Sequence, residues 1–287
     1  MTAKLKILIT SQKGGVGKST VSANLAAFFA HVEENKTSLV DLDHQATAGK
    51  WVRNAEPLGI QCISVTSPNS KGSGLALLEA KQALRSVAHD TEVLIADLTW
   101  TDILPAEFLF DFDLVLVPTS LSRVELDSTL EFVNRFSFVF NSTFRTPPKL
   151  VIVPSRVVNL ETYSNVFSQS FSTGFFLSPP VMFNESASDF FGAEYFVKAP
   201  SLEVRENFID FGRSVKHLGE IQVKEKQKPA SLYQSKMTGS ILDRFRAGMN
   251  EKASIRPVNA ANDFTKQSFQ DRMKAALPSF LRSTRYK

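Results

Sequence analysis

The stretch that decides the fold of this chain is Lys13-Gly14-Gly15-Val16-Gly17-Lys18-Ser19-Thr20. An apolar run, Leu5 to Ile9, precedes it, and a pattern with helical spacing begins near Val21. A strand that runs into a glycine-rich turn and then a helix is the layout of a phosphate-binding loop. The glycines let successive backbone N–H groups turn inward, and the helix adds its positive end. The stretch therefore predicts a site for the phosphates of a nucleotide.

The side chains of the loop extend this prediction. Lys18 is placed to reach the β- and γ-phosphates of a nucleoside triphosphate, and the Ser19 hydroxyl to be a ligand of Mg²⁺. The general pattern has a glycine five places before Gly17, where this chain has Gln12, and a second lysine, Lys13, opens the loop. The residues expected to bind the phosphates are Gly14, Gly15, Val16, Gly17, Lys18, Ser19 and Thr20.

This K-G-G-x-G-K-[ST] form is the deviant Walker A motif, and through it the chain resembles the ParA/MinD family of P-loop ATPases. The resemblance implies slow, Mg²⁺-dependent hydrolysis of ATP to ADP and phosphate, stimulated by a partner protein. It also implies an ATP-dependent homodimer, in which Lys13 reaches across to the ATP held by the other subunit. Lys13 and Lys18 are thus candidate catalytic residues.

A second candidate segment is Asp41-Leu42-Asp43-His44-Gln45, which ends a predicted strand. Open α/β sheets bind their ligands at the carboxyl ends of strands. The segment resembles the D-x-D-P-Q segment of ParA-type proteins, with His44 in place of the usual proline. The resemblance makes Asp43 the catalytic residue that orients the attacking water, and Asp41 an outer-shell partner of the magnesium.

A third candidate segment, Val93-Leu94-Ile95-Ala96-Asp97, resembles the Walker B strand. The resemblance implies that Asp97 holds a water bound to magnesium. ParA-type proteins usually continue with Cys-Pro-Pro or Thr-Pro-Pro, whereas this chain has Leu98-Thr99-Trp100. The chain therefore departs from the family at the segment that follows this aspartate.

Short apolar runs alternate with helical patterns from Leu5 to about Gly219. This alternation predicts an α/β fold with a largely parallel, twisted sheet covered by helices on both faces, and the resemblance makes it a P-loop NTPase. We expect an ATPase domain over residues 1–221 and a basic linker and tail, with short amphipathic helices, over 222–287. Strands are predicted at 5–9, 37–42, 60–65, 93–96, 114–117, 150–153 and 175–177, and helices at 18–31, 75–88, 123–140, 185–195 and 201–218.

Charge is unevenly spread along the 287 residues. Residues 222–287 hold 14 Lys and Arg against 5 Asp and Glu, a net charge of +9, so residues 1–221 carry −5 of the chain's overall +4. A basic tail is typical of contact with nucleic acid or a membrane surface, and equally of a merely solvated segment. We expect no signal peptide and no membrane span, and the single Cys62 excludes an internal disulfide. Together these features predict a cytoplasmic protein.

Three functions stay open at this point. The first is a ParA-like ATPase that partitions plasmid or chromosomal DNA or positions a protein cargo, in which ATP acts as a timer and the dimer binds DNA non-specifically. The second is a MinD-like regulator on a membrane surface, less favoured because Pro229, Pro257 and Pro278 interrupt the tail. The third is an accessory ATPase of a DNA-transfer system whose tail docks on a partner. Candidate DNA contacts on the last core helix are Arg205, Arg213, Lys216 and Lys224.

Overall fold

The computed structural model describes residues 3–65, 73–102, 104–158, 174–183 and 189–227. One sheet runs through these residues in the order β3-β2-β4-β1-β5-β6-β7, with β8 beside β6, and each of these strand pairs is parallel. The strands are β1 (Leu5–Ser11), β2 (Thr37–Asp41), β3 (Gln61–Ser64), β4 (Val93–Thr99), β5 (Leu114–Thr119), β6 (Lys149–Val157), β7 (Phe176–Leu177) and β8 (Val181–Met182). The predicted parallel α/β sheet is therefore confirmed.

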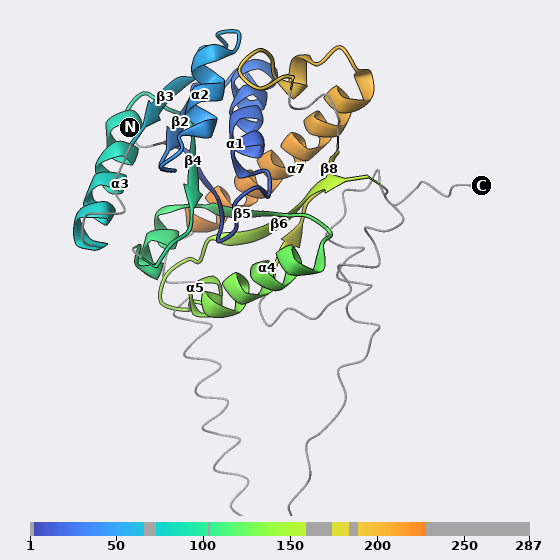
Figure 1. The fold of residues 1–287 in the computed structure, drawn as a ribbon. Coiled ribbons are helices and arrows are strands. Elements are labelled where there is room, and N and C mark those ends of the chain that lie inside the picture. Colours follow the sequence, from blue (N-terminus) through green and yellow to red (C-terminus); the bar gives the residue numbers. More distant parts are fainter. Residues whose placement is uncertain (1–2, 66–72, 103, 159–173, 184–188, 228–287) are drawn as a thin grey trace, which may run out of the picture. The chain divides into compact units, whose positions relative to one another are not determined.

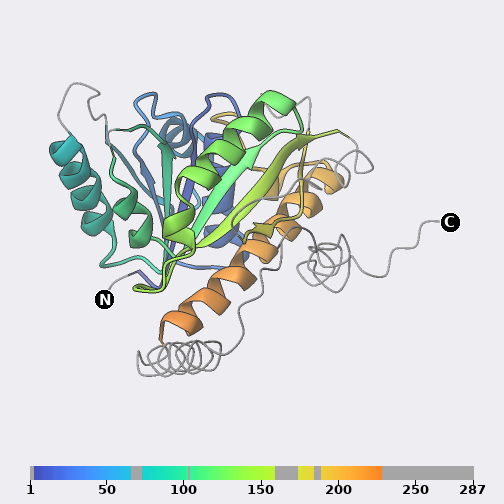
Figure 2. The same cartoon turned by 90° about the horizontal axis from the view of Figure 1, so that it is seen from below.

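Helices cover both faces of this sheet (Figures 1 and 2). One face carries α1 (Lys18–Ala27), α2 (Thr47–Asn54) and α7 (Leu202–Lys226), and the other α3 (Ser73–Val87), α4 (Arg123–Arg135) and α5 (Ser137–Phe140). A π-helix (Phe28–Val32) continues α1, and two 3₁₀-helices span Ala106–Asp111 and Phe196–Lys198. No helix within the described ranges is both long and apolar enough to span a membrane.

The central strands are nearly continuous runs of buried apolar residues, as expected where helices cover both faces of a sheet. Ile7 and Ile9 of β1 join the core formed with α1, α2 and α7, while Leu8, between them, points to the opposite face. Burial on both faces leaves the carboxyl ends of the strands as the place where polar side chains gather. β1, β2 and β4 end side by side there.

Two glycines let α7 approach the rest of the core closely. A Cβ atom built on Gly212 would lie 2.5 Å from Cγ of Phe28, and one on Gly219 would lie 2.7 Å from Cδ2 of Leu5. Phe28 and Leu5 are both buried. Side chains at these two positions would therefore push α7 away from β1 and the end of α1.

Several predicted boundaries differ in the structure. β4 and β6 run to Thr99 and Val157, beyond their predicted ends at 96 and 153. Residues 222–226, predicted as linker, are the last turn of α7, because Gln222 is buried and its amide donates a hydrogen bond to the Pro147 carbonyl at 2.7 Å. The predicted helix 123–140 breaks at Phe136, whose φ of −102° and ψ of 15° leave the helical region. Of the predicted helix 185–195, residues 189–193 form turns and 194–195 have no regular structure, while 185–188 lie outside the described residues.

The chain divides into a compact unit, Met1–Val223, and a second unit, Lys224–Lys287. The predicted amphipathic helices of the tail lie outside the described residues, as does most of the predicted loop before α3.

Candidate functional site

The loop between β1 and α1 has the backbone of an anion site. Gly15 and Gly17 have φ values of 75° and 92°, in the left-handed region that favours glycine. Gly17 precedes α1 directly, and no side chain caps the amino end of this helix. The first N–H groups of α1 therefore have no acceptor on a capping side chain and face the direction from which an anion can approach.

Three side-chain contacts hold this loop in shape, the first being a hydrogen bond from the Ser11 hydroxyl to the Lys13 carbonyl at 2.7 Å. Lys18 is only 6% exposed, and its Nζ donates a hydrogen bond to the Lys13 carbonyl at 3.2 Å. From β6, the Ser155 hydroxyl donates to the Val16 carbonyl at 2.8 Å. Lys13 itself is exposed. These hydrogen bonds fix the loop carbonyls of Lys13 and Val16, and the Lys18 ammonium is held close to the loop backbone.

Asp97, in β4, lies directly behind Ser19. Its Oδ2 accepts a hydrogen bond from the Ser19 hydroxyl at 2.8 Å, and its Oδ1 accepts one from the Ser22 hydroxyl at 3.1 Å. The side chain is fully buried, and this burial, together with the nearby charge of Asp41, raises the pKa of Asp97 to about 7. A hydroxyl and a carboxylate in contact are oxygen ligands of the kind that Mg²⁺ takes, and a cation here would offset the cost of ionising Asp97.

Asp41, at the end of β2, holds the turn that leads into α2. Its Oδ1 accepts a hydrogen bond from the Asp43 N–H at 3.0 Å, and its Oδ2 accepts one from the Gly49 N–H at 2.7 Å. Burial raises the pKa of Asp41, and the two backbone hydrogen bonds act against that rise. Both of its oxygens therefore have partners within the protein, and its charge acts on Asp97 from the neighbouring strand.

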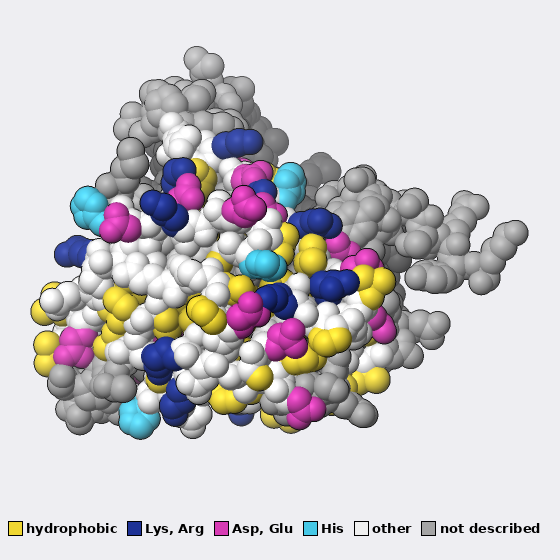
Figure 3. Space-filling view, turned by 90° about the horizontal axis from the view of Figure 1, so that it is seen from above, with side chains coloured by type: hydrophobic (Ala, Val, Ile, Leu, Met, Phe, Trp, Pro, Cys, Tyr) yellow, Lys and Arg dark blue, Asp and Glu magenta, His cyan; other side chains and the backbone are white. Residues whose placement is uncertain are grey.

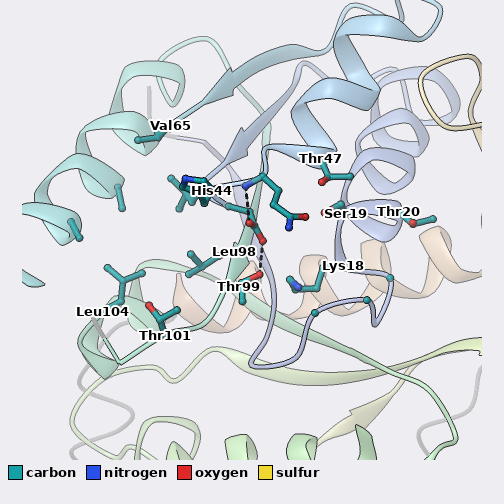
Figure 4. Close-up of a pocket in the computed structure, with 18 residues that line it drawn as sticks. Lys18, Ser19, Thr20, His44, Thr47, Val65, Leu98, Thr99, Thr101 and Leu104 are labelled. Atoms are coloured by element: carbon teal, nitrogen blue, oxygen red, sulfur yellow. Dashed lines mark hydrogen bonds between the residues drawn. The ribbon is translucent and has the colours of Figure 1, made fainter. Parts of the chain in front are cut away.

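Asp43 lies beyond the end of β2 and has partners on both carboxylate oxygens. Oδ2 accepts a hydrogen bond from the Thr99 hydroxyl, and Oδ1 accepts one from the Gln45 N–H at 3.1 Å. Figure 4 shows both hydrogen bonds: the one from Thr99 joins the end of β4 to the turn before α2, and the one from Gln45 lies within that turn. The Asp43 side chain is thereby oriented before any ligand binds.

These groups surround a cavity of about 630 Å³. Figure 4 shows Lys18, Ser19 and Thr20 at one end and Val65 and Leu104 at the other, with Thr99 between them. The lining residues are Gly14, Gly15, Gly17, Lys18, Ser19, Thr20, Leu42, Asp43, His44, Gln45, Thr47, Val65, Ala76, Ala80, Leu98, Thr99, Thr101 and Leu104. The cavity has room for a triphosphate along the loop.

The structure brings the predicted site residues together at the ends of three neighbouring strands. Most of the loop and Asp43 line the same cavity, whereas Lys13 and Val16 are not among its lining residues. Asp97 is buried and contacts the cavity residue Ser19, and Asp41 is buried on the neighbouring strand. Sequence reasoning missed Ser155 and Thr99, which hold the loop and Asp43. The available signal was that each of these two hydroxyl residues closely follows a predicted strand, 150–153 for Ser155 and 93–96 for Thr99. Among the described residues, no three His, Cys, Asp or Glu side chains cluster in a way that could hold a metal.

Comparison with known protein families gives one match along most of the chain. Residues 7–269 match the CobQ/CobB/MinD/ParA nucleotide binding domain. The sporulation initiation inhibitor protein Soj of Bacillus subtilis is 30% identical over 135 residues, which are 45% of this chain and 45% of Soj. The chromosome partitioning protein ParA of Myxococcus xanthus is 36% identical over 100 residues, 35% of this chain and 29% of ParA. The chain therefore spans less than half the length of these two relatives.

Solved structures agree with the fold. A plasmid partition protein of Borrelia burgdorferi, bound to AMPPNP, has a TM-score of 0.51 at 17% identity, covering 72% of this chain and 97% of its own. At this identity the likeness concerns the fold alone. It shows that this order of strands and helices is shared with a protein that holds an ATP analogue.

Proposed function

This chain belongs to the CobQ/CobB/MinD/ParA nucleotide-binding family, and from that premise we propose that it is an ATPase whose bound nucleotide decides whether two copies associate. The observation that carries the proposal is the uncapped amino end of α1 behind two left-handed glycines, with the buried Lys18 ammonium beside it. This arrangement presents N–H groups and a fixed positive charge to the phosphates. The relative named for chromosome partitioning, ParA of Myxococcus xanthus, supports an output in DNA or cargo positioning.

In the proposed complex, N–H groups of Gly14, Gly15, Val16, Gly17, Lys18, Ser19 and Thr20 contact the phosphates. Lys18 exchanges its hydrogen bond with the Lys13 carbonyl for phosphate oxygens, a stronger interaction because both partners are charged. Lys13 is exposed on the same loop, so its side chain is free to reach the nucleotide of a second subunit. That reach makes Lys13 the residue on which dimerisation depends.

The contact between Ser19 and Asp97 fits a magnesium ion that arrives with the nucleotide. Ser19 would be a direct ligand and Asp97 would hold a water of the ion, while Asp41 stays behind as an outer-shell charge and an anchor for the turn. The bound ion would neutralise charge on the β- and γ-phosphates. The buried carboxyl of Asp97 would ionise in its presence, because opposite charge favours the charged form.

Asp43 is the proposed orienting group for the attacking water. Its carboxylate lines the cavity beside Lys18, and each oxygen keeps a lone pair after accepting one hydrogen bond. A water that donates to one of these lone pairs is held near the terminal phosphate. Hydrolysis then depends on positioning rather than on a strong base, which accords with slow turnover.

Non-specific DNA is the proposed surface for the ATP-bound dimer, and the basic tail is its main contact. On α7, Lys216 pairs with Glu33 and Arg213 lies 3.7 Å from Asp210, so these cations are partly neutralised within the protein. On the face seen in Figure 3, Lys and Arg side chains are interspersed with Asp and Glu. The net charge of +9 on residues 222–287 is therefore the stronger source of attraction to phosphates.

The direct test is ATP binding and phosphate release by the full chain and two variants. Lys18→Ala should lose binding of a fluorescent ATP analogue by about tenfold or more, because a charge-assisted contact with phosphate is removed. Asp43→Asn should bind the analogue as the wild type does, yet release phosphate at least about tenfold more slowly. Equal phosphate release by the wild type and Asp43→Asn would refute the assigned role of Asp43, and absence of ATP binding by the wild type would refute the proposed function.

A further inference from the structure

The parallel register of β2 and β4 places Thr99 beside Asp43. Asp41 is aligned with Asp97 at the ends of these strands, and the Leu42 N–H donates a hydrogen bond to the Asp97 carbonyl at 2.9 Å. Asp43 follows Asp41 by two residues, and Thr99 follows Asp97 by two residues. Asp43 lies just beyond the end of β2, and the Thr99 hydroxyl donates a hydrogen bond to its Oδ2, so the pairing of β2 with β4 brings these two side chains together.

Thr99 is held from its other side as well. In the ladder between β1 and β4, Thr99 is aligned with Ser11, and the next residue, Trp100, donates its N–H to the Ser11 carbonyl at 3.0 Å. The Trp100 ring is 3% exposed and packs edge-on against Phe132 of α4 and against Phe136, which directly follows α4, at centroid distances of 5.9 and 5.1 Å. The backbone that carries Thr99 is therefore rigid, and it adjoins the strand that feeds the phosphate loop.

The hydrogen bond between Thr99 and Asp43 is a specific constraint on a carboxylate that lines the cavity. An Asp side chain without it could rotate about χ1 and χ2, since Asp43 is only half-buried. The second constraint, from the Gln45 N–H, belongs to the same turn as Asp43 and would move with it. Within the described ranges, the hydrogen bond from Thr99 is the one that ties the carboxylate to a different strand.

We propose that Thr99 is a positioning residue for ATP hydrolysis: its hydroxyl holds the Asp43 carboxylate in the orientation that aligns the attacking water. The inference rests on the proposed function, because it assigns Thr99 a part in that reaction. In this proposal Thr99 lines the cavity but acts through Asp43, not through its own contact with the phosphates. Its removal should therefore slow the chemical step and leave nucleotide binding unchanged.

Three substitutions of Thr99 distinguish the effect of losing its hydroxyl group from the effect of changing the shape of its side chain. Thr99→Val keeps the branched shape and removes the hydroxyl, Thr99→Ser keeps the hydroxyl, and Thr99→Ala serves if the valine variant does not fold. Phosphate release would be measured over a range of ATP concentrations, with fluorescent-analogue affinity and the melting temperature of each variant measured alongside. We expect Thr99→Val to lower kcat by about 10- to 100-fold with KM unchanged, and Thr99→Ser to stay within about threefold of the wild type.

The outcomes separate the two proposals. If the wild type hydrolyses ATP and Thr99→Val does so at the same rate, or if Thr99→Ser is as slow as Thr99→Val, the role of the Thr99 hydroxyl is wrong while the ATPase assignment stands. A rise in KM at constant kcat would likewise overturn it, since the residue would then act in binding. A wild type that binds no ATP overturns both proposals.

Discussion

At the scale of single residues, Asp97 is a group whose ionisation the fold opposes. Its pKa is raised from 3.8 to about 7, first by burial and then by the charge of Asp41. Between these values the folded state binds a proton that the unfolded state has released. The free energy of unfolding therefore falls as pH rises from about 4 to 7, because the unfolded state binds fewer protons there.

The predicted contribution of Asp97 is a loss of about 1.4 kcal/mol for each unit of pH within that window. Urea unfolding of the nucleotide-free protein in chelator would measure it, at intervals between pH 4.5 and 8. The matched control is Asp97→Asn, which keeps the shape of the side chain and has no ionisation. If the difference in stability between the two proteins does not change with pH, the carboxyl is ionised in the fold and the assigned pKa shift is wrong.

The sequence could predict single site residues where the signal lies in neighbouring positions, but not where a residue acts on another that is distant along the chain. Lys18 and Ser19 belong to one local pattern, and Asp97 ends a buried strand, so each could be chosen from its immediate neighbours. Ser155 holds the carbonyl of a residue 139 positions earlier, and Thr99 holds a carboxylate 56 positions earlier. Such contacts depend on strand order and register, which no local pattern reveals.

At the scale of elements, the packing of α7 on α1 depends on a residue without a side chain. A Cβ at Gly212 would lie 2.5 Å from Phe28 Cγ, and both residues are buried, so the ring has little room to move. Gly212→Ala should lower the free energy of unfolding by about 1–3 kcal/mol, the usual cost of overpacking a core. Chemical denaturation followed by circular dichroism would measure the change.

Gly74→Ala is the matched control for that substitution. Gly74 lies in α3, is exposed, and a Cβ there would meet no atom within 4 Å. Alanine is the better helix former by up to about 1 kcal/mol, so this variant should be as stable as the wild type or slightly more stable. Equal stability of Gly212→Ala and Gly74→Ala would contradict the close packing of α7 on α1.

Most strands could be predicted because their apolar runs are bounded by turns, whereas several helix limits could not. The segment that forms α2, Thr47–Asn54, is short and contains Gly49, whose N–H binds the Asp41 carboxylate. Its helix depends on that contact rather than on local propensity. Similarly, the last turn of α7 follows from the burial of Gln222, although its sequence is polar and charged. Tertiary contacts, rather than local sequence, determine both the formation of α2 and the end of α7.

At the scale of the whole molecule, the uneven charge leads to a prediction about DNA. With ATP the protein should bind duplex DNA of any sequence, and affinity should fall steeply as salt rises, because binding releases counterions from the phosphates. With ADP or no nucleotide, binding should be much weaker. Fluorescence anisotropy with a labelled duplex over a salt series measures both effects. Binding that is equal in all three nucleotide states would contradict a nucleotide-controlled output.

The central claim is that ATP joins two copies of this chain, and the molar mass in solution tests it most directly. Light scattering would be measured on the wild type and on Asp43→Asn, which retains ATP longer, with ATP, with ADP and without nucleotide. The wild type and Asp43→Asn should have twice the monomer mass with ATP, and the monomer mass with ADP or without nucleotide. Lys13→Ala should have the monomer mass under every condition. Lys50→Ala, at an exposed position on α2, should dimerise as the wild type does. If Asp43→Asn keeps the monomer mass with ATP, or if Lys13→Ala forms a dimer, ATP-dependent dimerisation through Lys13 is wrong.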